Sequence, residues 1–447
     1  MKQKFFLGAL MAGMAVFTAC SSDDEMVMPA GVGEADGDVQ EIVLQVANED
    51  GLVAKRAGRP LFSSEAAQDV DFVKIYAYST ENNRIAKVYT IENWQTVSSV
   101  VSDGREYKLR LTGSNKLDVG SYKFVAYAYS DGSDYEFSDI QNSWNIGTEY
   151  TAGNLTATLK SGVPDAEEVF AGENVDEEGN CTPVVVKKVT ITDGDGQEQP
   201  KVEYIKGFST SIRLARQVAG TFGYFKAIPA KISDKDVASL RLVAVAKNTK
   251  LTFNNFNLLS GDDYSGKEMY VVNGSVSAPA VETVKLANNT QAYEIYTIDL
   301  SDWFTGSDEK NGMDTNGDGV LSLGDTWTNP YDGQAKFVEG SVFAGCFVIP
   351  FAMDESKNNT FELQFLDASG AVLATRNVKL TADLQSGETN YSYNVVRNHM
   401  YNIGYKADSQ NDKEEEEIEE PISLSGDQEL LTNVISNWEL LHHMTVE

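Results

Sequence analysis

Short runs that are apolar throughout, or that alternate apolar and polar residues, dominate the pattern of this chain. The run from Val39 to Val46 predicts a first strand, and Val70 to Tyr78 is apolar on both faces, as in a fully buried strand. The segment from Tyr107 to Leu111 has period two, and Tyr122 to Tyr129 is a further apolar and aromatic run. Helix-period stretches of comparable length are scarce, so the pattern predicts a β protein.

More strands are predicted along the rest of the chain, and Gly, Asn, Asp or Ser separates most of them. Many short strands with such separators favour β-sandwiches. We therefore expect an all-β fold of two tandem β-sandwich domains of the transthyretin-like type, with few short helices. The further strands are expected at 151–159, 184–191, 212–225, 240–245, 271–276, 293–300, 343–351, 360–366 and 391–403.

The expected domain boundary follows Pro229, in the polar stretch from Ala230 to Asp236. It divides the chain into an N-terminal sandwich at 57–234 and a C-terminal sandwich at 235–410, before a tail at 411–447. The tail opens with an acidic run whose self-repulsion keeps it extended, as a tether. Its remainder is apolar again and needs a groove to fill, either on its own chain or on a neighbour.

The first 20 residues have the pattern of a lipoprotein signal peptide. Lys2 and Lys4 precede an apolar run that continues to Val16, and small residues then lead to Cys20. In such signals the cysteine is lipidated, and its acyl chains supply a stable bilayer anchor. The alternative is a plain signal peptide with a chance cysteine. The acidic residues after Cys20, from Ser21 to Glu25, resemble the tag that sends Bacteroidetes lipoproteins to the outer leaflet of the outer membrane.

Net charge narrows the choice of partners. The chain carries 36 basic and 67 acidic residues, a formal charge of −31, so it repels phosphate backbones and nucleic acid is not an expected partner. Solubility and protection of sheet edges are the default interpretation of this charge.

Several segments, in their order along the chain, resemble the Bacteroidales fimbrillins, the lipoprotein-derived subunits of type V pili. They are the lipobox at Cys20, the basic stretch Lys55–Leu61 with Ser63–Ala66 after it, Ile212–Ala219, Asn398–Ile403, and the tail with Asn437–Glu439.

The resemblance implies a structural role at the cell surface. An outer-membrane lipoprotein precursor would be cut by an arginine-specific protease, and the propeptide at 21–56, which carries the first strand, would leave. Arg56 and Arg59 are the candidate cleavage residues, and Arg56 is favoured because Pro60 follows Arg59. The vacated groove would accept a strand from another copy or from a related fimbrial subunit, which gives an extracellular fimbria that contributes to adhesion.

The apolar tail is the expected donor strand, with Trp438 as its anchor. The alternative is that the tail completes its own C-terminal sandwich. Tip adhesins of the family are expected to lack a free C-terminal extension, so the tail favours a stalk position over the rival functions of tip adhesin or glycan-binding surface lipoprotein. The expected donor residues are Leu430, Val434, Trp438 and Leu440.

A stretch of twelve residues that begins at Asp314 matches a calcium loop. Oxygen ligands stand at positions one, three and five, Gly319 at position six permits the turn, and position twelve is an acid. An aspartate at position twelve resembles the dockerin type more than paired EF-hands, and bound Ca²⁺ would stiffen the loop. A solvated turn is the alternative. The expected ligands are Asp314, Asn316, Asp318, Val320 through its carbonyl, Ser322 and Asp325.

Catalytic patterns are few. The chain has 3 histidines, and it lacks the Gly-x-Ser-x-Gly, His-Glu-x-x-His and Cys-x-x-Cys motifs and a phosphate loop. No enzyme activity and no organic cofactor are therefore expected. Cys181 and Cys346 are either one disulfide or two buried thiols, and the sequence leaves both open.

Overall fold

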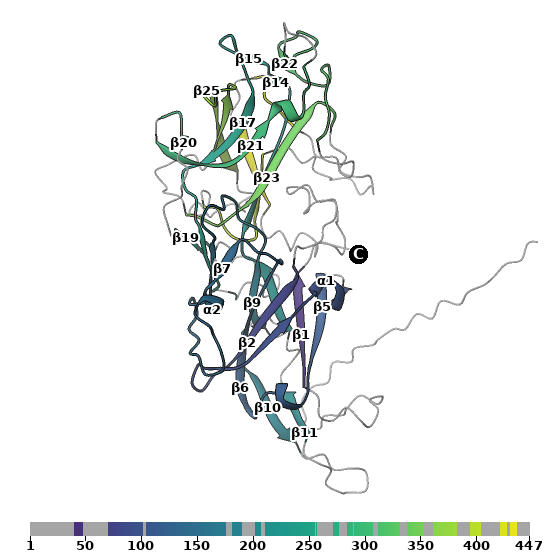
Figure 1. Cartoon of the computed structure of the whole chain (residues 1–447), viewed down its shortest axis with the longest axis vertical. Coiled ribbons are helices and arrows are strands. Elements are labelled where there is room, and N and C mark those ends of the chain that lie inside the picture. The colour runs from purple at the N-terminus through teal and green to yellow at the C-terminus, as the bar shows by residue number, and fades with distance from the viewer. Residues whose placement is uncertain are drawn as a thin grey trace, which may run out of the picture.

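The computed structural model describes residues 40–47, 70–101, 104–175, 181–189, 202–206, 211–254, 256, 271–276, 284–288, 290–306, 312–330, 338–352, 361–381, 394–403, 421–426 and 430–435. These residues are mainly strands, as expected for an all-β chain, arranged in a lower and an upper half (Figure 1). The helices among them are single turns: α1 (Trp94–Val97), α2 (Ser138–Gln141), η3 (Gly113–Asn115) and η5 (Leu300–Asp302). None of the described helices is long and apolar enough to cross a membrane.

The lower half in Figure 1 is built on a ten-stranded sheet that contains the first strand. Its order is β11-β10-β6-β9-β12-β1-β5-β4, with β2 pairing with β6 and β3 with β2. The strands are β1 (Gln40–Ala47), β2 (Phe72–Ser79), β3 (Ile85–Ile91), β4 (Ser99–Val101), β5 (Gly104–Leu111), β6 (Gly120–Tyr129), β9 (Phe170–Val175), β10 (Val184–Val189), β11 (Val202–Lys206) and β12 (Ser211–Arg216).

This sheet folds back on itself around one core. Ile75 of β2 and Phe124 of β6 pack in the same buried cluster as Ile212 and Leu214 of β12. Because strands from both wings of the sheet share this cluster, the arrangement is that of a sandwich. Tyr76, the next residue of β2, lies in a second cluster on the opposite face. The prediction that this strand is buried on both faces is therefore confirmed.

The upper half is built on a second sheet of ten strands, in the order β20-β21-β17-β24-β25-β28-β26-β13-β23, with β27 paired to β13. The strands are β13 (Ala219–Lys226), β17 (Ser239–Ala244), β20 (Val284–Lys285), β21 (Gln291–Asp299), β23 (Ser341–Val348), β24 (Phe361–Leu366), β25 (Val372–Thr381), β26 (Met400–Ile403), β27 (Ile422–Ser423) and β28 (Leu430–Ile435). Two short pairs complete this half: β14 (Ile228–Pro229) with β22 (Val320–Leu321), and β15 (Lys231–Ile232) with β16 (Lys235–Asp236).

A small sheet joins the two halves. Its order is β19-β18-β8-β7, in which β7 (Tyr135–Phe137) and β8 (Thr156–Leu159) come from the first half of the chain. Strands β18 (Lys250–Thr252) and β19 (Gly274–Ser275) come from the second. The rings of Tyr127 and Phe253, one from each half, lie 5.9 Å apart in a continuous apolar cluster. The halves therefore share both backbone hydrogen bonds and a core.

The chain changes sheet around Gln217, between β12 and β13. Gln217 is fully buried, and its backbone N–H donates to the Val169 carbonyl at 2.9 Å. The sequence predicted one strand at 212–225, whereas the structure has two strands, β12 and β13, in different sheets. An apolar run carries no sign of such a change, because both strands are buried. The predicted domain boundary near 234 stays a prediction.

A buried ion pair fixes α2 against β2. The Asp139 carboxylate accepts hydrogen bonds from Lys74 Nζ at 2.7 Å, from the Tyr127 hydroxyl at 2.8 Å, and from the Tyr76 hydroxyl. The Asp139 side chain is 0% exposed and that of Lys74 is 18% exposed. Burial, and then the nearby carboxylate, raise the pKa of both tyrosines, so the phenols remain donors.

Removing this carboxylate leaves a buried ammonium group and two phenols without their acceptor. We expect Asp139→Ala to lower the free energy of unfolding by about 3–5 kcal/mol in urea titrations. The control is Asp236→Ala, because Asp236 pairs with Lys231 across 3.4 Å at the surface, where both side chains are at least half exposed. That change should cost less than about 1 kcal/mol. Equal effects of the two variants would contradict a stabilising role for the buried pair.

His399 lies buried beside the change of sheet. Its Nδ1 donates to the Arg397 carbonyl at 2.8 Å, and its own carbonyl accepts from the Gly220 amide at 2.9 Å. Burial lowers the pKa of His399 to about 4, against 6.5 for an ordinary histidine, while the bond to Arg397 opposes this shift. The side chain is therefore neutral in the folded protein at neutral pH.

This shift makes stability depend on pH. The folded state binds a proton at His399 more weakly than the unfolded state does. The contribution of His399 to the free energy of unfolding is therefore complete above pH 6.5 and is lost as the pH falls towards 4. The loss amounts to about 3 kcal/mol over that window. We expect unfolding titrations to show this pH dependence in the parent chain and to show less of it in His399→Gln. An identical pH dependence in both chains would exclude His399 as its source.

Candidate functional site

Strand β1 is held on both of its edges. All eight of its residues pair antiparallel with β5, from Gln40 opposite Leu111 to Ala47 opposite Gly104. On the other edge, residues 43–46 pair parallel with 211–214 of β12. A strand bonded to two neighbours cannot leave without exposing the backbone groups of both.

The walls around β1 are apolar on the core side. Leu111 of β5 and Ile212 and Leu214 of β12 are buried in the N-terminal core. Lys108 of β5 and Arg213 of β12, which belong to the opposite faces of the same two strands, are exposed. The walls thus have one core face and one solvent face, and they define what we call the N-terminal slot: the space between β5 and β12 that β1 fills.

Gln40 fixes the start of β1 in this slot. Its side-chain amide donates to the Leu117 carbonyl at 2.9 Å, and its side-chain oxygen accepts from the Leu117 amide at 2.7 Å. Both residues are 1% exposed. The carboxamide therefore satisfies two buried backbone groups that would otherwise lack partners. Gln40 could not be singled out from the sequence, because a polar residue at the start of a strand is normally solvated.

Residues 48–69 connect β1 to Val70, the first residue of the following described segment. A cut anywhere in this connection would leave β1 bound by non-covalent contacts alone. The predicted lipidation residue Cys20 and the predicted cleavage residues Arg56 and Arg59 lie outside the described residues.

The C-terminal tail lies on its own half of the molecule. Strand β27 pairs with β13, and the Leu424 amide donates to the Lys226 carbonyl at 2.9 Å. Strand β28 lies between β25 and β26, where Leu430 is 1% exposed. Residues 421–426 and 430–435 therefore complete the C-terminal sheet, which is the alternative that the sequence left open for the tail.

The four predicted donor residues divide into two pairs. Leu430 pairs with Val378 of β25, and Val434 pairs with Tyr401 of β26. Trp438 and Leu440 lie outside the described residues.

The predicted calcium loop is a compact turn closed by its first and last acids. Asp314 accepts from the amides of Gly317 at 2.8 Å and Gly319 at 2.9 Å. Asp325 accepts from the amides of Thr315 at 2.8 Å and Ser322 at 2.9 Å. Gly319 has φ +87°, in the left-handed region that position six of the motif requires.

The remaining predicted ligands surround this turn. Asn316 donates through its amide to Asp318 at 3.1 Å, and Val320 belongs to β22, which pairs with β14. Within the described ranges, no three His, Cys, Asp or Glu side chains are grouped as a metal ion would need. Three of the six predicted ligands are an amide oxygen, a hydroxyl oxygen and a backbone carbonyl oxygen, and these do not belong to His, Cys, Asp or Glu side chains. Calcium binding stays a prediction.

The two cysteines beyond the signal segment are free thiols. Burial raises the pKa of Cys346 to about 12, although its contact with Thr221 opposes this. Burial and Glu173 raise the pKa of Cys181 to about 12. Both groups are thus protonated and poor nucleophiles at neutral pH.

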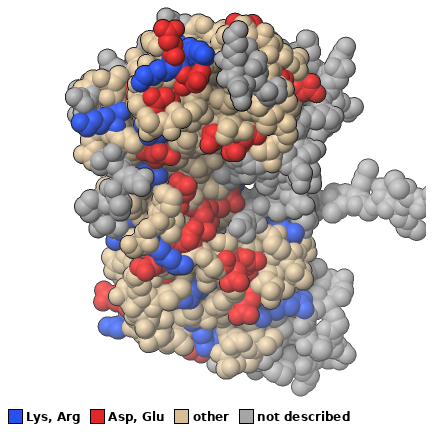
Figure 2. All heavy atoms as spheres, turned by 45° about the horizontal axis from the view of Figure 1, so that its top comes forward, with Lys and Arg blue, Asp and Glu red and all other residues tan. Residues whose placement is uncertain are grey.

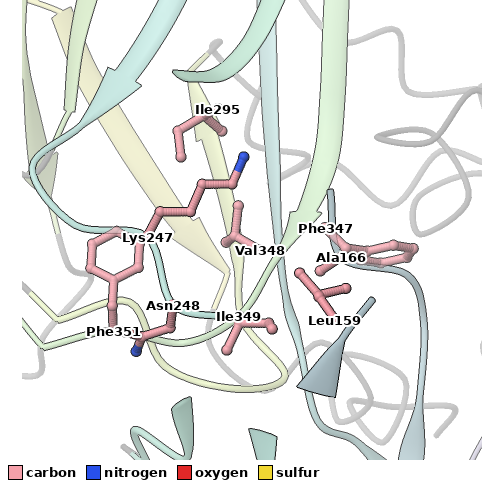
Figure 3. Close-up of a pocket in the computed structure, with 9 residues that line it drawn as sticks. All are labelled: Leu159, Ala166, Lys247, Asn248, Ile295, Phe347, Val348, Ile349 and Phe351. Carbon is pink, nitrogen blue, oxygen red and sulfur yellow. The ribbon is translucent and has the colours of Figure 1, made fainter. Parts of the chain in front are cut away.

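A small cavity lies where the two halves meet (Figure 3). Leu159 and Ala166 come from the first half of the chain, and the other lining residues, including Lys247 and Phe347, come from the second. The space is about 10 Å³, on the order of one water molecule, so it cannot hold an organic ligand. Lys247 Nζ bonds to the Glu294 carbonyl at 3.0 Å and lies 3.5 Å from Asp165.

Acidic side chains are spread over the face of the molecule drawn in Figure 2, with a group near the waist between the halves. This distribution agrees with the formal charge of −31. Lys and Arg side chains lie on the same face in smaller groups among the acids.

No family model matches this chain, and no curated protein matches its sequence. Solved structures of fimbrial proteins are similar in fold. A fimbrilin of Porphyromonas gingivalis has a TM-score of 0.39 at 11% identity over 88% of this chain and 96% of its own. The tip fimbrial protein Mfa3 of the same organism has 0.35 at 10% identity over 83% and 96%. A fimbrial assembly protein of Parabacteroides distasonis has 0.33 at 9% identity over 83% and 92%.

Other similar structures are described as putative adhesins or cell adhesion proteins, and one as a putative polysaccharide-binding protein.

The calcium prediction can be tested by spectroscopy. If Ca²⁺ binds the loop, chelation should lower the melting temperature by roughly 2–6 °C. Tb³⁺ should also show luminescence sensitised by Trp327, two residues after Asp325. Asp318→Ala should abolish both effects, because Asp318 is an exposed predicted ligand whose loss spares the Asp314 bonds. Asp302→Ala, outside the loop, is the control. No metal-dependent change in the parent chain would identify the loop as a solvated turn.

Proposed function

We propose that this chain is a subunit of a cell-surface fimbria and polymerises by strand exchange after proteolysis. The observation that supports this is the position of β1, bonded along both edges yet joined to the rest of the chain by one connection, 48–69. That connection contains the basic stretch with Arg56 and Arg59.

Cleavage and removal of β1 would turn a satisfied sheet into an acceptor. The backbone groups of β5 and β12 would lose their partners, at positions that include the buried Ile212, Leu214 and Leu111. A strand from another copy restores both sets of contacts, since main-chain hydrogen bonds provide affinity and alternating side chains set the register. Several hundred square ångströms of apolar surface correspond to about 10 kcal/mol before ordering costs.

The acceptor slot and the donor tail are different surfaces of the molecule. Contacts between unlike surfaces do not close on themselves, so they propagate as a filament. A chain with both a slot and a C-terminal tail fits a stalk position, where each copy accepts one strand and donates another. Because β28 pairs with β25 and β26 of its own chain, the tail would have to leave that sheet before it is donated. Before the cut, lipid on Cys20 would hold the precursor at the outer membrane, and an arginine-specific protease would release it into the fimbria.

Arginine-specific cleavage of the purified precursor tests this proposal. We expect cleavage to release a fragment that contains β1 and to give fibres in electron micrographs and ladders that resist SDS. Arg56→Ala should prevent both. Arg59→Ala should leave both unchanged, because Pro60 already blocks cleavage after Arg59. If the cleaved chain keeps the fragment and stays monomeric in size-exclusion chromatography, the proposal is wrong.

A further inference from the structure

An exposed segment of the lower half, residues 140–148, carries no charged side chain. It reads Ile-Gln-Asn-Ser-Trp-Asn-Ile-Gly-Thr and begins within α2, on the left of Figure 1. Two of the seven large apolar side chains that are exposed among the described residues lie in it, Ile140 at 53% and Ile146 at 64%. In a chain of which 23% of the residues are charged, an uncharged surface with exposed apolar side chains marks a candidate contact site.

Trp144 lies half-buried in the middle of this segment. The centroid of its ring lies 5.5 Å from that of Tyr76 and 6.1 Å from that of Tyr150, both at steep interplanar angles. The two tyrosines are buried, and the Trp144 amide donates to the Asp139 carbonyl at 2.9 Å. The indole is therefore fixed in position while part of its surface stays in contact with solvent. A ligand that packed on it would lose little affinity to the ordering of this side chain.

The backbone of the segment is tied at its end and strained before the tryptophan. The Gly147 amide donates to the Ile85 carbonyl at 2.8 Å, and the Ile85 amide donates to the Thr148 carbonyl at 2.8 Å. Ser143 has φ +51°, in the left-handed region that a serine rarely adopts. Backbone strain of this kind is concentrated at sites that bind or react. The position of the indole is thus set by contacts on both sides of it.

The two asparagines on either side of the tryptophan keep hydrogen-bonding groups available. Both are exposed. Asn142 uses its Nδ2 on the Ser138 carbonyl at 2.7 Å, and Asn145 accepts through Oδ1 from the Thr148 hydroxyl at 3.4 Å. Within the part of the chain that the structure describes, the Asn142 Oδ1 and the Asn145 Nδ2 bond to no protein group. The segment thus offers one acceptor and one donor next to an accessible aromatic ring.

This combination of groups matches a neutral saccharide. One face of a pyranose ring is a row of C–H groups that packs on an aromatic ring, and its hydroxyl groups both donate and accept hydrogen bonds. The guanidinium group nearest in the contacts of the segment, Arg84, already bonds to the Gly147 carbonyl at 2.6 Å. Glu149, at the end of the segment, is exposed and would repel sialic acid or sulfate.

The size of the segment also favours a small ligand over a protein. A standard protein interface takes about 20–30 residues from each side, and this segment supplies nine. A single sugar ring needs one aromatic face and a few polar groups at its edge.

We propose that residues 140–148 form a binding site for neutral saccharides, in which a sugar ring packs on Trp144 and its hydroxyl groups bond to Asn142 and Asn145. The site belongs to the lower half and uses neither β1 nor the tail, so it does not depend on strand exchange. In a fimbria, each subunit would carry one such site, and the repetition of weak sites would give firm attachment to a glycan surface.

A glycan array probed with the uncleaved precursor tests this site. The array carries neutral oligosaccharides of hexoses and N-acetylhexosamines beside sialylated and sulfated ones, and we expect binding to the neutral group. Asn142→Ala with Asn145→Ala should lower the affinity for the most strongly bound oligosaccharide about tenfold or more in calorimetric titrations. Asn288→Ala, which changes an exposed asparagine of the upper half, is the control and should alter the affinity less than about twofold.

Variants of the tryptophan provide a second measurement. Trp144→Ala should abolish binding, and Trp144→Phe, which keeps an aromatic ring, should retain part of it. Urea titrations of both variants show whether the packing on Tyr76 and Tyr150 is kept. The asparagine variants change only exposed side chains, so they test the site even if Trp144→Ala does not fold.

Four results would overturn the proposal. They are an array on which the parent binds no neutral glycan, a preference for sialylated or sulfated glycans, equal affinity of the parent and the double asparagine variant, and binding that survives Trp144→Ala. An empty array, together with self-association of the precursor that Ile146→Ser removes in sedimentation, would instead identify the segment as a contact between copies of the chain.

Discussion

The structure of this chain depends on the requirement that buried backbone groups have partners. In the N-terminal sheet, β5 and β12 do not pair with each other and are held in one sheet by the strand between them. Strand β1 is joined to the following strands of the sheet by one covalent connection, residues 48–69. The arrangement makes β1 structurally necessary, because the backbone groups along the facing edges of β5 and β12 have their partners in β1.

Much of the fold could be predicted from local pattern. Strands such as β2, β6 and β24 are apolar runs bounded by turn residues, and each was found close to its expected place. The order of strands within the sheets could not be predicted, because pairing partners are distant in sequence and many apolar strands are interchangeable in pattern. The change of sheet at Gln217 was missed for the same reason, since its burial depends on contacts with Val169 and other distant residues.

The candidate site could likewise be predicted in part from local pattern, and the rest depends on contacts between residues distant in sequence. The first strand and the apolar tail were recognisable from sequence, and the structure brings each of them into a slot between two neighbours. The importance of Gln40 depends on a contact with Leu117, 77 residues away, and no local pattern reveals it.

The small sheet β19-β18-β8-β7 has a mechanical consequence. In a filament linked through the N-terminal slot of one copy and the tail of another, pulling force would enter each subunit at one half and leave at the other. The force would pass across backbone hydrogen bonds such as those between Thr156 and Thr252 and across the shared core at Phe253. Each subunit would then carry the load through both the small sheet and the shared core.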